Sequence, residues 1–299
     1  MRTRPPPTRG PGTRSGARAL LAAALLSGAS AAAQDCADPP PDAAGRKRIE
    51  RFSARVADVD ARLELILADG RRVKVAGLDP PRPTPDAPDL DETTARRLKS
   101  WLGGRDALFV PLYKAPDRWG RIVAEAYAPV GAGKAPASVA GVALEAGLAR
   151  FEAGEASRRC RAYLLGREGA ARAAGLGVWA DPYYAVLAPG DRAAFAERAG
   201  TTAIVEGEVV DVETSDYRVA LLFGERRGRD FSVSIERRDL KRFTAAGLDP
   251  AALKGGKVRV RGVLDLRFGP RIEIERPEEI ELIAPADMPA AGAAAPEPR

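Results

Sequence analysis

Residues 52–79 are the segment that most restricts the fold of this chain. Their sequence is FSARVADVDARLELILADGRRVKVAGLD. Apolar residues alternate with other residues before and after an Asp-Gly turn, at Leu63, Leu65, Leu67, Val73 and Val75. Alternation of period two that is broken by Asp-Gly predicts antiparallel strands in a meander. The folded part of the chain therefore begins with β-structure.

Helices and further strands follow this meander. Leu90, Thr94, Leu98 and Trp101 share one face of a helix expected over 91–102, which Gly103 and Gly104 end. The patterns that come next predict two strands and two helices, at 106–113, 121–129, 138–149 and 157–174.

The second half of the chain repeats a β-rich pattern. Three strands, a short helix and two strands are expected, at 202–212, 217–224, 229–236, 239–246, 257–266 and 271–275. This is the element order of an OB-type barrel. We therefore predict a mainly β protein with helices (α+β), in which an OB-fold five-stranded barrel precedes a second OB-like barrel.

The N-terminus has the composition of a secretory signal. Arginines without any acid precede the apolar run ALLAAALLSGASAAA, which ends in small residues, so we expect cleavage after Ala33 and a periplasmic or secreted protein. The run is too short to span a bilayer comfortably, and no membrane span is expected after cleavage. The expected domains are then an arm (34–51), a first domain (52–182), a linker with a helix (183–201), a second domain (202–283) and a disordered tail (284–299).

Composition limits the chemistry. The chain has 47 basic and 41 acidic residues, but five of the basic ones lie in the leader, so the mature protein is nearly balanced and its pI carries no argument for nucleic acid. The absence of histidine excludes Ser-His and Cys-His nucleophiles and the usual zinc sites. In an exported protein the two cysteines, Cys36 and Cys160, are expected to form one disulfide.

Five stretches resemble the staphylococcal nuclease (thermonuclease) family in order and spacing. They are VADVDARLEL, VKVAGLDPP, DRWGRIVAEAY, ALEAGLARF and EGAARAAGLGVWADP, and the resembling region is residues 52–182. The resemblance implies a five-stranded OB barrel with three helices. It also implies Ca²⁺-dependent cleavage of phosphodiesters in DNA or RNA. We further expect the protein to be a monomer.

The resemblance places metal ligands and catalytic groups on particular residues. The two aspartates that hold Ca²⁺ in the family fall on Asp60 and Asp79, and the ligating carbonyl falls on Pro80. One of the family's two phosphate-binding arginines falls on Arg121, whereas Lys74 stands at the other position and lacks the bidentate fork.

Arg82 stands where the family has a catalytic glutamate. A guanidinium cannot accept a proton, so the resemblance implies weakened catalysis. Four acids that follow could supply a substitute base in a differently folded loop: Asp86, Asp89, Asp91 and Glu92.

Two further places could contact nucleic acid. Trp119 is flanked by Arg118 and could offer an aromatic surface for a base, although it could equally pack on the barrel rim. In the second domain the alternation of KVRVRG sends Arg259 and Arg261 to one face of a strand. A merely solvated polar face is the alternative there, since residues 202–283 carry 15 bases and 16 acids.

Three functions therefore stay open. The first is an exported, Ca²⁺-dependent nuclease, which Asp60, Asp79 and Arg121 support. The second is a catalytically inactive module that binds nucleic acid or other phosphate polymers, which the exchange of acid for base at Arg82 supports. The third is an envelope protein whose tandem barrels bind protein or glycan.

Overall fold

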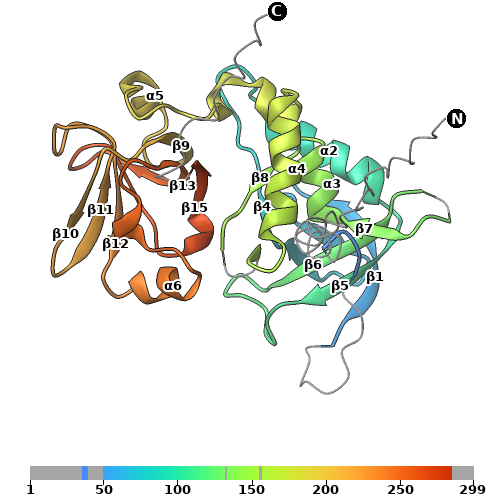
Figure 1. The fold of residues 1–299 in the computed structure, drawn as a ribbon. Coiled ribbons are helices and arrows are strands. Elements are labelled where there is room, and N and C mark those ends of the chain that lie inside the picture. The colour runs from blue at the N-terminus through green and yellow to red at the C-terminus, as the bar shows by residue number, and fades with distance from the viewer. Residues whose placement is uncertain (1–35, 40–49, 132, 155–156, 285–299) are drawn as a thin grey trace, which may run out of the picture.

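The computed structural model describes residues 36–39, 50–131, 133–154 and 157–284, and they form two β-barrels with helices (Figure 1). Each barrel encloses its own cluster of buried apolar side chains. The predicted α+β fold is confirmed. The predicted leader, most of the N-terminal arm and the tail beyond residue 284 lie outside the described residues.

The first barrel is closed by five strands. They are β1 (Phe52–Val59), β2 (Leu65–Leu67), β3 (Arg72–Val75), β5 (Asp106–Pro111) and β6 (Arg121–Pro129). Antiparallel pairs join β1 to β2, β2 to β3, β5 to β6 and β1 to β5, and a parallel pair joins β3 to β6. The hydrogen-bonded path thus returns to its start, and β7 (Pro136–Ser138) extends it beside β6.

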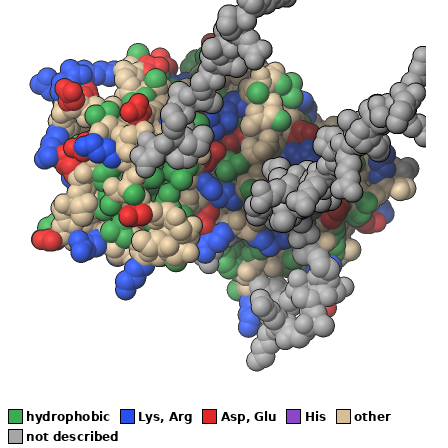
Figure 2. Space-filling model, viewed as in Figure 1, with side chains coloured by type: hydrophobic (Ala, Val, Ile, Leu, Met, Phe, Trp, Pro, Cys, Tyr) green, Lys and Arg blue, Asp and Glu red, His purple; other side chains and the backbone are tan. Residues whose placement is uncertain are grey.

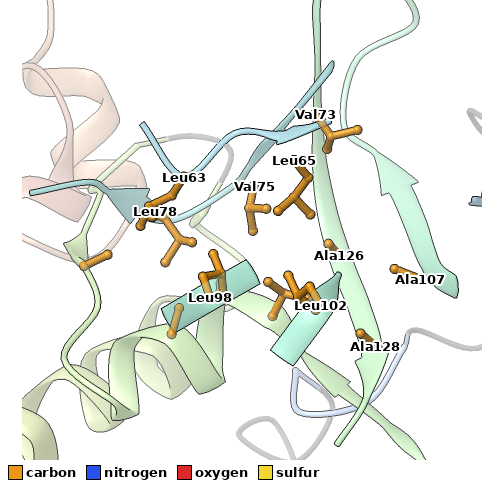
Figure 3. Close-up of a cluster of buried hydrophobic side chains, with 14 of the residues drawn as sticks. Leu63, Leu65, Val73, Val75, Leu78, Leu98, Leu102, Ala107, Ala126 and Ala128 are labelled. Atoms are coloured by element: carbon orange, nitrogen blue, oxygen red, sulfur yellow. The ribbon is translucent and has the colours of Figure 1, made fainter. Parts of the chain in front are cut away.

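The predicted helix over 91–102 is α2 (Leu90–Leu102), which packs against the core of this barrel. Its buried residues include Leu98 and Leu102, which point toward Leu65 and Val75 inside the barrel (Figure 3). Gly104 follows with a φ of +74°, a conformation that glycine adopts without strain. The helix therefore ends where the Gly-Gly pair predicted.

The two helices that follow are shorter than expected. α3 (Val139–Glu145) stops before Gly147, whose φ is +64° and whose backbone meets that of Leu176 so closely that a Cβ would lie 2.0 Å from the Leu176 oxygen. α4 (Arg161–Ala173) begins only after Cys160. Cys160 forms the predicted disulfide with Cys36, which ties the N-terminal arm to the start of α4.

A short sheet connects distant parts of the first barrel. β4 (Leu78–Asp79) pairs antiparallel with β8 (Arg150–Phe151), and Asp79 lies opposite Arg150. Two-residue strands have no periodic signal, so the sequence did not predict this pairing. It decides the surroundings of Asp79, as described below.

The second barrel has the same strand order as the first. Its elements are β9 (Thr202–Glu208), β10 (Asp211–Thr214), β11 (Arg218–Leu222), β12 (Ser232–Glu236), α6 (Leu240–Ala245), β13 (Lys257–Asp265) and β14 (Arg271–Glu273). β9 pairs with β13, β12 lies parallel to β14, and the chain runs from β9 almost directly into β10, so the chain itself joins the two ends of this strand order. A strand that the sequence analysis missed, β15 (Ile280–Ala284), adds to β13.

Short elements link the barrels. Between the barrels lie the 3₁₀ turns η2 (Gly177–Ala180) and η3 (Pro182–Tyr184) and the helix α5 (Arg192–Glu197). The second barrel contains two further 3₁₀ turns, η4 (Pro250–Ala252) and η5 (Pro277–Glu279). Within the described ranges, no helix has the length and apolar character needed to cross a membrane.

Candidate functional site: a charged cleft on the first barrel

A small cleft of about 110 Å³ opens where β3, the loop after β4 and the start of β6 meet. Three predicted site residues line it together: Lys74, Pro80 and Arg121. Arg62 and Glu64, from the turn between β1 and β2, complete the charged part of the lining. The cleft therefore presents three cations and one carboxylate.

Arg121 is held by two carboxylates. Its Nη1 lies 2.6 Å from Oε1 of Glu64, and its Nη2 lies 2.7 Å from Oδ2 of Asp117. Burial disfavours the guanidinium charge, but the hydrogen bonds to Asp117 and Glu64 outweigh it and raise the pKa of Arg121. The group is therefore fixed and permanently charged at the cleft.

Glu64 is the cleft residue that sequence reasoning missed. Alternation with Leu63 and Leu65 placed it on the outer face, yet its side chain is only 3% exposed. Leu63 has a φ of +56°, so the strand pattern is interrupted just before β2 and three consecutive residues turn inward. The four acids considered as substitute bases lie in or just before the first turn of α2, outside the lining of the cleft.

Asp60, the first expected metal ligand, has its oxygens occupied by the protein. Its Oδ1 accepts hydrogen bonds from the backbone N–H groups of Arg62 and Glu64, and its Oδ2 lies 2.7 Å from Nη2 of Arg72. The same Nη2 lies 2.6 Å from Oε2 of Glu64. The guanidinium of Arg72 thus lies between the carboxylates of Asp60 and Glu64 and balances their negative charge.

Asp79, the second expected ligand, is paired with Arg150 across the β4–β8 ladder. Its Oδ2 lies 2.8 Å from Nη2 of Arg150, whose Nη1 donates to the carbonyl of Thr202 in the second barrel. Asp79 lines a separate cavity of about 320 Å³ between the two barrels. The structure therefore places Asp79 toward the second barrel.

The two other charged residues of the predicted site, Lys74 and Arg82, differ in their surroundings. Nζ of Lys74 lies 2.6 Å from Oε1 of Glu152, the residue that follows β8. Arg82 is exposed, and within the described part of the chain only its backbone forms hydrogen bonds, both with the hydroxyl of Tyr184. The segment Arg150–Glu152 thus neutralises one acid and one base of the predicted site.

These donors do not fit a Ca²⁺ site as they stand. Calcium takes six to eight oxygen ligands that converge at roughly 2.3–2.6 Å. Asp60 and Asp79 each face a guanidinium, and Asp79 lines a cavity that does not include Pro80. Among the described residues, no group of three or more Asp, Glu, His or Cys is arranged to hold a metal ion.

An exposed aromatic residue lies beside the cleft, at the predicted position. Trp119 is 60% exposed, and the guanidinium carbons of Arg118 and Arg121 lie 4.2 Å and 4.6 Å from the centre of its ring. Arg121 therefore joins the cleft to this aromatic surface. The arrangement combines positive charge with a π-face, as single-strand binding surfaces do.

Arg259 and Arg261 occupy the predicted outer face of β13, but α4 and β15 cover that face. Arg261 is 4% exposed, lies 2.9 Å from Glu168 and 2.7 Å from Glu281, and donates to the carbonyl of Phe151. Arg259 is paired with Glu206 and Glu281. Strand alternation predicted the direction of these side chains, and it carried no signal for the helix packed against them.

The buried pair of Arg261 and Glu168 joins the two barrels. Burial opposes ionisation of both groups, yet their mutual attraction outweighs it, so the pKa of Glu168 is lowered and that of Arg261 is raised. Nucleic acid could reach Arg261 only by opening this junction. We assign it a structural role.

The fold defines a protein built of two OB-type barrels in tandem, with a charged cleft and an exposed tryptophan on the first. A scan against known protein families found no matching family, and a search of curated proteins found no match either.

Proposed function

We propose that this protein is an exported module that binds nucleic acid or a similar phosphate polymer through its first barrel, without Ca²⁺-dependent cleavage. The observation that carries the proposal is the position of Arg72 and Arg150, which pair with the two carboxylates that would hold Ca²⁺ in the thermonuclease family it resembles. Arg82, in place of the family's glutamate, adds a cation at the position of the base.

Exposed cations around the cleft support binding to a polyanion. Arg62, Arg82 and Arg118 are exposed, and no carboxylate of the described chain is paired with their guanidinium groups. Guanidinium groups match the geometry of phosphate oxygens, and Trp119 beside Arg118 could stack on a base. The Cys36–Cys160 disulfide supports export, because disulfides persist in oxidising compartments outside the cytoplasm.

Gel retention of single-stranded DNA across a salt series tests this proposal. We expect retention that falls with salt, and the double variant Arg62→Gln/Arg118→Gln should reduce the slope of log K against log salt by about 1.4. Arg97→Gln/Lys134→Gln, which also removes two exposed charges, from α2 and from the turn between β6 and β7, is the matched control. Equal retention by the double variant and the control would overturn the assignment of the surface.

Metal-dependent hydrolysis is the second candidate, because Glu64 places a buried carboxylate in the cleft 2.6 Å from Arg121. A carboxylate beside a phosphate-binding arginine could activate water. Incubation of DNA with the protein, in Ca²⁺ or in EDTA, distinguishes hydrolysis from binding. Chelator-sensitive cleavage that is lost in Glu64→Gln would favour hydrolysis, and intact DNA in both conditions would favour binding.

A further inference from the structure

A large cavity lies on the boundary between the barrels, away from the cleft. It measures about 790 Å³, and its walls come from the start of α4, from α6 and the turn after it, and from η5 and β15. Such a volume lies within the range of small-molecule sites, which is roughly 300–1,000 Å³. Lys and Arg side chains lie along this boundary in Figure 2.

The charged lining of this cavity is strongly one-sided. Four cations, Arg158, Arg161, Lys241 and Arg242, face a single carboxylate, Glu278. Two of the cations are already compensated, since Arg158 is paired with Glu278 and Arg242 is paired with Asp239 outside the cavity.

Arg161 and Lys241 are the two cations without a carboxylate partner in the described chain. The guanidinium of Arg161 donates to the backbone carbonyls of Glu278 and Ile280, which carry no full negative charge. Burial, only partly offset by Glu281, lowers the pKa of Arg161. Lys241 is exposed at the rim, and its ammonium group makes no polar contact with the described residues. A negative ligand would satisfy both groups.

The rest of the lining is apolar. Ala246 and Leu248 after α6 form one side of the cavity, and Leu282 of β15, which is 53% exposed, forms another. A bare inorganic anion would leave this surface uncovered. A ligand with a doubly charged end and an organic body fits both parts.

We propose that this cavity binds a phosphate-bearing organic molecule, with its phosphate between Arg161 and Lys241 and its organic part against Ala246 and Leu248. A phosphate or pyrophosphate group carries the two charges that the uncompensated cations require, and guanidinium binds its oxygens in a fork. The inference goes beyond the proposed function and does not depend on it, because the cavity and the cleft share no residue.

Calorimetric titration of the purified protein with pyrophosphate tests the site. Lys241→Glu should weaken binding at least tenfold, since it replaces a charge-assisted contact with a repulsive one. Phenyl phosphate should bind more tightly than inorganic phosphate, and Ala246→Trp should remove this difference by filling the apolar part. Lys134→Glu, with the same change in net charge, should leave the affinity within twofold. The absence of binding at millimolar pyrophosphate, or an equal loss in Lys134→Glu, would overturn the proposal.

Competition with short oligonucleotides identifies the source of the phosphate. Displacement of pyrophosphate by a 5′-phosphorylated octathymidylate, but not by the unphosphorylated one, assigns the site to a polymer end. Displacement by neither assigns it to a free phosphorylated molecule. Equal displacement by both would mean that the cavity attracts any polyanion, and the proposed site would be rejected. Arg62→Gln/Arg118→Gln should leave the pyrophosphate titration unchanged, so failure of the cleft and failure of the cavity give different results.

Discussion

Replacement of Arg261 by methionine tests how the two barrels are held together. The guanidinium contacts both oxygens of Glu168, one oxygen of Glu281 and the carbonyl of Phe151, and the Glu168 side chain is fully buried. In Arg261→Met the remaining cation near Glu168 is Arg172, at 3.5 Å. Breaking a buried pair on one side costs about 3–5 kcal/mol, and we expect a loss of that size in the free energy of unfolding at pH 7.

The pH dependence of this loss has a definite sign. In the native chain the pKa of Glu168 lies below its ordinary value of 4.5, so the ionised group stabilises the fold above that pH, and this contribution disappears as the pH falls through the lowered pKa. In Arg261→Met burial prevails and raises the pKa, so the ionised carboxylate destabilises the fold near neutral pH. The difference between the two proteins should therefore shrink from pH 7 toward pH 4.

Urea denaturation followed by tryptophan fluorescence and by circular dichroism measures the effect. All three tryptophans precede residue 183, so fluorescence reports on the first barrel, whereas circular dichroism reports on both. Arg261→Met/Glu168→Gln is the control, because it removes the charge together with its partner and should recover much of the stability. A loss below about 1 kcal/mol at pH 7, or a loss that grows toward pH 4, would refute the account of the junction.

Three other changes have expected outcomes. Arg72→Ala removes the guanidinium between the carboxylates of Asp60 and Glu64, so we expect a gain of Ca²⁺ affinity in calorimetry. Unchanged heats of Ca²⁺ binding would contradict the view that Arg72 takes the place of a metal ion. Loss of the Cys36–Cys160 disulfide in Cys36→Ser should lower stability by about 2–5 kcal/mol in urea denaturation. Gly147→Ala should destabilise the first barrel by more than 1 kcal/mol, since the new Cβ would clash with the Leu176 oxygen, and a wild-type melting temperature would contradict this.

The sequence predicted the strands and helices of both barrels well, because their patterns are local. Alternation places Val258 and Val260 in the second core and turns Arg259 and Arg261 outward, as the structure confirms. The Gly-Gly pair after Leu102 likewise marks the end of α2. Both signals depend on neighbours within a few residues.

The charge pairing of the site could not be predicted in the same way. Arg150 reaches Asp79 through a two-residue ladder that joins positions 71 residues apart, and nothing in either stretch shows that they are partners. Glu64 turns inward because of one left-handed residue, Leu63, which is not a glycine and gives no turn signal. The sequence therefore identified the candidate site residues, but only the structure shows which residues pair with them.

The closed strand order of each barrel has a consequence for the order of folding. Every strand pairing of the first barrel lies within residues 52–151, and the disulfide joins residues 36 and 160, so this half contains all of its own strand pairings and its disulfide. Domains generally fold as units, the N-terminal one first during synthesis. The first barrel can thus close and form its disulfide before β9 has been synthesised, and its contacts with the second barrel, among them the ion pair of Arg261 with Glu168, must wait for the rest of the chain.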